Sequence, residues 1–136
     1  MMPSASARLV AEHVTSLGRI GAEVSCVDSS RDALSATDAE LTRRPTRLRV
    51  RLAQVDLAAL ALGKVQLKLP PQHVVVVDGL TDSLPERAAV GLMRWVRQQL
   101  APGGQTVVTA LAPATDEGIV RHLLSWPILR RSPAAV

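Results

Sequence analysis

Four consecutive valines, Val74 to Val77, stand near the middle of the chain and lead directly into Asp78. An unbroken apolar run of this kind is typical of a strand in a parallel sheet, because helices cover both faces of such a strand and neither face needs polar side chains. The run therefore predicts a central parallel strand over residues 73–78. It also requires the rest of the chain to supply helices for both faces.

A helix is predicted to follow this strand after a short loop. Ser83 and Glu86 have capping-box spacing, and Pro85 suits the first turn of a helix. From there to about Leu100, apolar residues recur at helical spacing on a face that we expect to point inward, namely Ala89, Leu92, Met93, Val96 and Leu100. The Pro-Gly-Gly sequence at 102–104 ends the helix, and a further strand is predicted over residues 105–112.

The remaining elements are predicted from periodicity in the same way: helices over residues 5–17, 30–42 and 119–124, and strands over residues 22–28 and 47–52. Ser29 and Asp32 have capping-box spacing at the start of the helix over 30–42. Residues 54–71 follow no single period. Strands that alternate with helices indicate an α/β fold, a Rossmann-like and mostly parallel sheet sandwiched by helices. A length of 136 residues fits a single domain over residues 1–136.

The strand over residues 47–52 alternates strictly between arginine and apolar residues. Arg47, Arg49 and Arg51 would therefore share one face of the sheet, which places this strand at a sheet edge. One interpretation is a row of guanidinium groups that binds phosphates. The other, which we favour, is a charged edge strand that resists pairing with other chains.

Composition excludes several classes of protein. Hydrophobic residues make up 47% of the chain and charged residues 21%, which is globular composition. We expect no membrane-spanning helix and no secretory signal, and hence a cytoplasmic protein. Cys26 is the single cysteine, which rules out an internal disulfide and a cysteine-based metal cluster. The net charge of +4, with 14 arginines against 2 lysines, fits either a polyanionic partner or ordinary solubility, and we favour solubility.

An acidic residue stands at or just beyond the end of each of three predicted strands. Asp28 ends the first strand, Asp56 follows the second, and Asp78 ends the third. Ligands of open parallel sheets bind beyond the carboxyl ends of the strands, where a carboxylate can accept hydrogen bonds from both hydroxyls of a ribose. Asp28 is suited to that role, Asp56 to the exocyclic amine of a base, and Asp78 with Gly79 to the reacting end of a ligand. The three together predict a nucleotide-like ligand.

Other common sites are not present in the sequence. It contains neither G-x-G-x-x-G nor G-x-x-x-x-G-K-[ST], the two loops that hold phosphates, and no G-x-S-x-G nucleophile motif. His13, His73 and His122 are isolated from one another, so we expect no metal site. Cys26 lies inside a predicted strand and is expected to be an inert, buried thiol. No residue is assigned a catalytic role.

Three segments resemble class I S-adenosylmethionine-dependent methyltransferases. Residues 21–34 resemble that family's second strand, its acidic ribose-binding tip and the next helix, and residues 54–57 resemble the segment that lines its adenine pocket. The most specific match is the L-x-P-G-G turn at 100–104, followed by a strand. A narrower resemblance, over residues 78–87 and 125–131, is to the extracellular-factor 3-hydroxypalmitic acid methyl ester biosynthesis methyltransferases.

The resemblance implies S-adenosylmethionine as the cofactor and a small molecule as the methyl acceptor, such as the carboxylate of a hydroxy fatty acid. The residues that it implies for the cofactor are Asp28, Ser29, Asp56, Leu57, Asp78 and Gly79. Those that it implies for the acceptor are Asp82, Trp126 and Arg130, since arginine can bind both oxygens of a carboxylate. The alternative is a catalytically inactive, methyltransferase-like interaction module. A nucleic acid partner is not expected, because no aromatic side chains stand beside the arginines. A membrane partner is not expected either, because no membrane-spanning helix is predicted.

The family's first strand and glycine-rich loop would precede the predicted helix at residues 5–17, but only four residues of this sequence do so, and we expect both features to be lacking. In the family that strand lies between the strands that here end at Asp28 and Asp78. We therefore expect these two strands to pair directly, or a second copy or a partner chain to supply the strand between them, because unpaired backbone groups in a core cost roughly 1–3 kcal/mol each.

Overall fold

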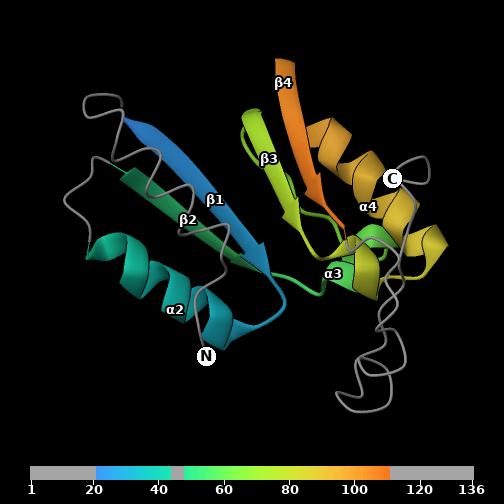
Figure 1. Ribbon diagram of the computed structural model, residues 1–136, viewed down its shortest axis with the longest axis horizontal. Coiled ribbons are helices and arrows are strands. Elements are labelled where there is room, and N and C mark those ends of the chain that lie inside the picture. The colour runs from blue at the N-terminus through green and yellow to red at the C-terminus, as the bar shows by residue number, and fades with distance from the viewer. Residues whose placement is uncertain (1–20, 44–47, 111–136) are drawn as a thin grey trace. The chain divides into compact units, whose positions relative to one another are not determined.

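The computed structural model describes residues 21–43 and 48–110 (Figure 1). Two compact units meet in the sequence between Leu57 and Ala58. The helices predicted over residues 5–17 and 119–124 lie outside the described residues, as do His13, His122, Trp126 and Arg130. Within the described part of the chain, no helix is long and apolar enough to cross a membrane.

The first unit contains a parallel β-α-β arrangement. Strand β1 (Ala22–Asp28) pairs with β2 (Leu48–Gln54) in a parallel register that runs from Ala22 opposite Leu48 to Asp28 opposite Gln54. Helix α2 (Arg31–Thr42) connects them and buries a stripe formed by Leu34, Thr37 and Leu41. These elements confirm the strand, helix and strand predicted for this part of the sequence. Among the described strands, β2 pairs with β1 alone.

The cap of α2 differs from the prediction by one residue. Ser30, and not Ser29, is the N-cap: its backbone is extended and its Oγ accepts a hydrogen bond from the amide of Ala33 at 3.2 Å. Asp32 lies in the first turn, where a negative charge interacts favourably with the helix dipole. The hydroxyl of Ser29 instead accepts a hydrogen bond from the amide of Leu57.

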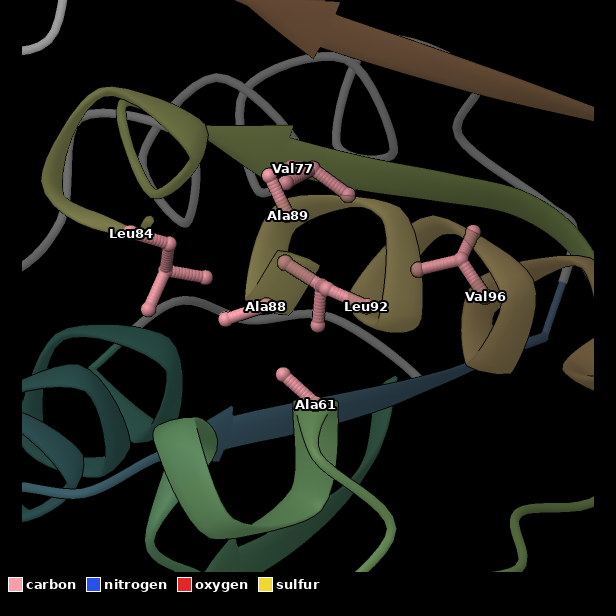
Figure 2. Close-up of a cluster of buried hydrophobic side chains, with 7 residues drawn as sticks. All are labelled: Ala61, Val77, Leu84, Ala88, Ala89, Leu92 and Val96. Carbon is pink, nitrogen blue, oxygen red and sulfur yellow. The ribbon is translucent and has the colours of Figure 1, made fainter. Parts of the chain in front are cut away.

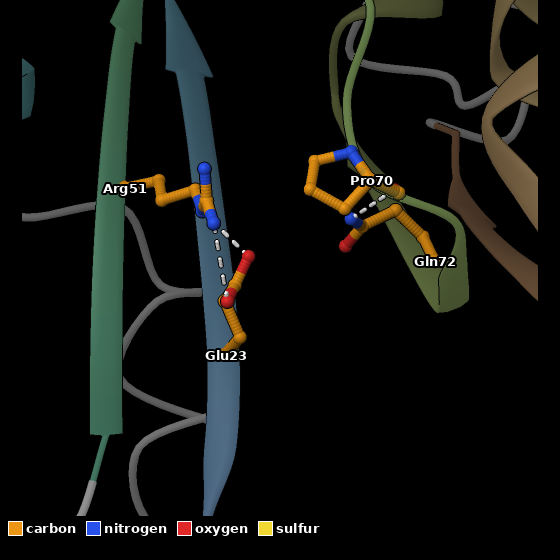
Figure 3. A network of polar contacts seen from close by, with 4 residues as sticks. All are labelled: Glu23, Arg51, Pro70 and Gln72. Atoms are coloured by element: carbon orange, nitrogen blue, oxygen red, sulfur yellow. Dashed lines mark hydrogen bonds and ion pairs between the residues drawn. The ribbon is translucent and has the colours of Figure 1, made fainter.

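One face of the β1–β2 sheet is polar. The guanidinium of Arg51 on β2 forms an ion pair with Glu23 on β1, with Nε 2.6 Å from Oε1 (Figure 3). Arg49, the register partner of Glu23, is exposed on the same face, and Arg47 lies outside the described residues. Because a neighbouring carboxylate neutralises Arg51, the arrangement favours the charged-strand interpretation over a row of phosphate-binding guanidinium groups.

The second unit is also a parallel β-α-β arrangement, preceded by one short helix. Strand β3 (Gln72–Asp78) leads through the 3-10 helix η1 (Thr81–Ser83) and α4 (Glu86–Gln99) into β4 (Leu100–Thr109), which pairs with β3 in parallel. The short helix, α3 (Leu57–Ala61), falls in the segment for which no period could be found. At the start of β3, the Gln72 side chain donates to the carbonyl of Pro70 at 2.6 Å (Figure 3).

The core of the second unit lies between α4 and one face of β3–β4 (Figure 2). Its buried side chains are Ala61, Val77, Leu84, Ala88, Ala89, Leu92 and Val96, with Val75 and Val108 packed against them. The opposite face of the two strands is open: Val74 is 57% exposed, Val76 39% and Val107 50%. The four-valine strand is therefore covered on one face in the described chain, and the expectation of cover on both faces is not met there.

Helix α4 begins without the capping box that the sequence predicts. Pro85 is the N-cap and no side chain caps it, while the hydroxyl of Ser83 donates back to the carbonyl of Leu80 at 2.9 Å. Leu84 precedes the cap and belongs to the same buried cluster as Ala89 in the first turns of the helix. A hydrophobic contact of this kind fixes the entry of the chain into the helix in place of a polar cap.

Strand β4 starts five residues earlier than predicted. Leu100 pairs with Gln72, and the ladder resumes at Gln105 opposite Val74, so the L-x-P-G-G turn is an excursion inside the strand. Gly103 has a φ of 76°. A Cβ on Gly104 would lie 2.8 Å from the carbonyl oxygen of Gln72, which explains why this position of the turn requires glycine.

Candidate functional site

Asp28 ends β1 with its carboxylate held in place by the next turn. Its Oδ1 accepts a hydrogen bond from the backbone amide of Ser30 at 2.8 Å, and the residue is half-buried. Within the described residues Oδ2 makes no hydrogen bond. One carboxylate oxygen therefore fixes the orientation of the group, and the other is available to accept hydrogen bonds from a ligand beyond the strand end.

Ser29 joins the loop after β1 to the loop after β2. Its Oγ accepts from the amide of Leu57 at 3.3 Å, and its carbonyl accepts from the side-chain amide of Gln54, also at 3.3 Å. The amide of Val55 donates to the carbonyl of Asp28 at 3.0 Å and continues the same connection. The four residues that the sequence analysis assigned to ribose and adenine are thus neighbours at one end of the first unit: Asp28, Ser29, Asp56 and Leu57.

A second set of strand-end residues lies in the second unit. The hydroxyl of Thr109, at the end of β4, donates to Oδ1 of Asp78 at 2.5 Å and accepts from the amide of Gly79 at 2.9 Å. Gly79 adopts a φ of 61°, in the left-handed region that favours glycine. The structure therefore places Asp78 and Gly79 at the carboxyl end of β3 beside Thr109, a residue that the sequence analysis did not single out. The register Asp78 opposite Thr109 is the signal that would have identified it.

Asp82 lies in η1, immediately after the end of β3, and is 4% exposed. Its neighbour Thr81 is 2% exposed. A carboxylate this deeply buried does not face open solvent in the described chain, so direct contact between Asp82 and an acceptor stays a prediction. Trp126 and Arg130, the other two acceptor residues suggested by the sequence, lie outside the described residues.

The described residues contain no group of three or more His, Cys, Asp and Glu side chains that could hold a metal ion. Cys26 is half-buried on β1. Burial raises the pKa of its thiol above the ordinary value of 9.0, and the nearby carboxylate of Asp38 on α2 raises it further. Because the thiolate is the reactive form, this environment fits the inert thiol that the sequence predicts.

Solved structures share this arrangement of elements. The CcbJ methyltransferase from Streptomyces caelestis matches 85% of this chain and 53% of its own, with a TM-score of 0.59 and 23% sequence identity. The glycopeptide N-methyltransferase MtfA matches 84% of this chain and 57% of its own, with a TM-score of 0.54 and 22% identity. The chain therefore has a Rossmann-like α/β fold similar to that of these two methyltransferases. This confirms the α/β architecture that the sequence indicates.

The methyltransferase fold is present here in part: the chain spans just over half the length of these two enzymes. No family model matches the sequence, and no curated protein matches it. The narrower resemblance to the 3-hydroxypalmitic acid methyl ester enzymes stays a prediction. The single domain over residues 1–136, and the pairing expected between the strands that end at Asp28 and Asp78, also stay predictions.

Proposed function

We propose that this chain binds S-adenosylmethionine and is part of a methyltransferase that acts on a small molecule. The observation that carries the proposal is the carboxylate of Asp28: the amide of Ser30 fixes it through Oδ1, and Oδ2 has no hydrogen bond from any described residue. In doubly wound folds, a carboxylate at this strand end is the group that accepts hydrogen bonds from ribose hydroxyls. The fold shared with CcbJ and MtfA supports the same proposal.

The described donors and acceptors fit the nucleoside half of this cofactor. Asp28 would accept from the ribose hydroxyls, while the connection from Ser29 to the amide of Leu57 holds the wall on which the adenine would lie. Asp56, which is exposed and directly precedes Leu57, would accept a hydrogen bond from the exocyclic amine of the adenine. When bound, S-adenosylmethionine supplies a methyl group on a sulfonium that is already electrophilic, so the main task of the protein is to position the acceptor.

We place the acceptor beyond β3, where Asp78, Gly79 and Asp82 follow the strand end. The first candidate is a small-molecule carboxylate such as that of a hydroxy fatty acid, because residues 78–87 resemble enzymes of that class. A carboxylate is itself a competent nucleophile at neutral pH and needs no general base. In this proposal Trp126 and Arg130 would border the acceptor.

Calorimetric titration of the full chain with S-adenosylmethionine, and separately with S-adenosylhomocysteine, tests the cofactor. We expect a Kd tighter than about 100 µM, which corresponds to about 5–6 kcal/mol of binding free energy. Asp28→Asn is the decisive variant, because the amide oxygen of asparagine can still accept from the Ser30 amide while the negative charge is lost. It should weaken binding at least ~tenfold, as expected for hydrogen bonds to a charged group.

Asp32→Asn is the matched control, since it removes an exposed carboxylate four residues away without touching the strand end. It should leave the Kd unchanged. Equal losses in Asp28→Asn and Asp32→Asn would contradict a ribose contact at Asp28. No heat at millimolar ligand would overturn the proposal and favour the alternative, a methyltransferase-like module that binds a partner without catalysis. For the acceptor, methyl transfer to 3-hydroxypalmitate would support the carboxylate, and transfer only to amines would exclude it.

A further inference from the structure

A groove of about 690 Å³ lies on the second unit, and none of the strand-end residues of the candidate site lines it. Its walls are α3 with the irregular segment that follows it on one side, and the middle and last turns of α4 on the other. This volume is within the range of sites for small ligands, roughly 300–1,000 Å³.

The irregular wall is held in place by side chains of α4. The indole N–H of Trp95 donates to the carbonyl of Leu67 at 2.8 Å, and Oε1 of Gln99 accepts from the amide of Leu69 at 2.9 Å. Gln99 is buried and its Nε2 also donates to the carbonyl of Trp95 at 3.4 Å. These bonds keep a segment without secondary structure at a fixed separation from the helix. The groove is therefore preformed, which lowers the entropy that a ligand must lose on binding.

The floor of the groove is a contact between backbones. A Cβ on Gly91 would lie 1.9 Å from the carbonyl oxygen of Ala61, so α3 and α4 touch where Gly91 has no side chain. Around this floor stand apolar groups that the fold leaves partly uncovered: Leu62 is 43% exposed and Val65 37%. These side chains offer contact area to an apolar ligand group.

Two cations line the same groove. Lys68 comes from the irregular wall and Arg94 from α4, and both are exposed. Neither forms a salt bridge within the described residues. Gln98, one turn after Arg94, adds an amide group to the same side. Two positive charges without an ion-pair partner among the described residues, beside partly exposed leucine and valine side chains, match a ligand with a negative head group and an apolar body.

We propose that this groove binds a free amphiphilic anion, with a carboxylate or phosphate head group at Arg94 and Lys68 and an apolar body along Leu62 and Val65. The site is independent of the proposed cofactor site, because it uses neither the strand ends nor Asp28. It is a second ligand site on the methyltransferase fold, suited to an effector or a second substrate. Neither a small inorganic anion nor a neutral alcohol satisfies both halves of the groove.

Calorimetry of the full chain with four probes tests the proposal: octanoate, octyl phosphate, acetate and 1-octanol. We expect octanoate or octyl phosphate to bind at least ~tenfold more tightly than acetate and 1-octanol, because each of the latter keeps only one of the two interactions. Fluorescence gives the location. In a Trp126→Phe background Trp95 is the single tryptophan, and its emission should change with the same Kd as the calorimetric signal.

Arg94→Gln should weaken octanoate binding at least ~tenfold, as expected for the loss of a charge-assisted hydrogen bond. The matched control is Arg97→Gln, which removes an exposed arginine of the same helix that does not line the groove. The proposal is overturned by equal losses in the two variants, by 1-octanol binding as tightly as octanoate, or by no binding of either amphiphile. Asp28→Asn should leave octanoate binding unchanged, so failure of the cofactor proposal and failure of this one give different results.

Discussion

The hydroxyl of Thr109 donates a hydrogen bond to Oδ1 of Asp78 across the carboxyl ends of β3 and β4. Oγ1 of Thr109 also accepts a hydrogen bond from the amide of Gly79, so the side chain of Thr109 holds both Asp78 and the turn that follows it. Because the two strands are parallel, residues 31 positions apart in the sequence meet at one edge of the sheet. This relationship defines the geometry of the end of the second unit at which we place the methyl acceptor.

Replacing Thr109 with valine keeps the shape of the side chain and removes both hydrogen bonds. We expect the free energy of unfolding to fall by about 1 kcal/mol, since an exposed hydrogen bond is partly replaced by water. Urea denaturation followed by circular dichroism measures the change. Thr109→Ser, which retains the hydroxyl, should lose clearly less, and a serine variant as unstable as the valine variant would show that the methyl group, not the hydroxyl, matters.

Gly91→Ala should destabilise the protein even though alanine is the better helix former by about 1 kcal/mol. The new Cβ would lie 1.9 Å from the carbonyl oxygen of Ala61, which forces α3 and α4 apart. Overpacking of this kind costs about 1–3 kcal/mol, so the net effect on thermal unfolding is a lower Tm. Val90→Ala, at an exposed position next to Gly91, is the control and should leave Tm nearly unchanged. A Gly91→Ala variant with a raised Tm would contradict the close contact.

The ion pair between Glu23 and Arg51 should contribute little to stability. The side chain of Arg51 is 60% exposed and that of Glu23 33%, and pairs in contact with water typically contribute about 0.2–1 kcal/mol. A double-mutant cycle with Glu23→Gln and Arg51→Gln measures the coupling energy directly. That energy should decrease between 0.05 and 1 M NaCl, roughly, because salt screens exposed charges. A coupling that is large and independent of salt would indicate a pair shielded from solvent.

Cys26 should make the protein less stable at alkaline pH. Burial and then Asp38 raise its pKa above 9.0, so between the unfolded and folded pKa values the folded state holds more protons. Its contribution to stability is therefore fully present below pH 9.0 and is lost as pH rises through the folded pKa. The test is the difference in urea midpoint between wild type and Cys26→Ala from pH 8 to 11. Asp38→Asn should move the loss to lower pH, and a pH-independent difference would contradict the shift.

The sequence predicted best the elements that depend on local pattern. The strand over residues 22–28, the helix ending at Thr42 and the helix ending near Leu100 follow from periodicity, and each is present with those boundaries to within one residue. The Pro-Gly-Gly sequence was wrongly predicted to end the second of these helices: α4 ends at Gln99, and Pro-Gly-Gly lies inside β4. Helix α3 was missed because five residues are too few to establish a period of 3.6.

The candidate site was predicted in part for the same reason. Asp28 and Asp78 could be identified because each ends a strand, which is a local property. Ser29 and Ser30 are locally equivalent as candidates for the N-cap of α2. The amide of Leu57, 28 residues from Ser29, donates to the Ser29 hydroxyl, and the Ser30 hydroxyl caps the helix. Thr109 depends on register, which a sequence alone does not give. Contacts distant in sequence thus decided the finer assignments.

No residue separates the end of α4 at Gln99 from the start of β4 at Leu100. A single residue inserted there would rotate the helix by about 100° or move the strand by one position, and a one-residue shift turns every side chain of a strand to the opposite face. The exposed tip at Pro102 and Gly103 stands outside the ladder and could take up extra residues. Insertions and deletions between relatives of this chain should therefore occur at that tip and be rare at the junction.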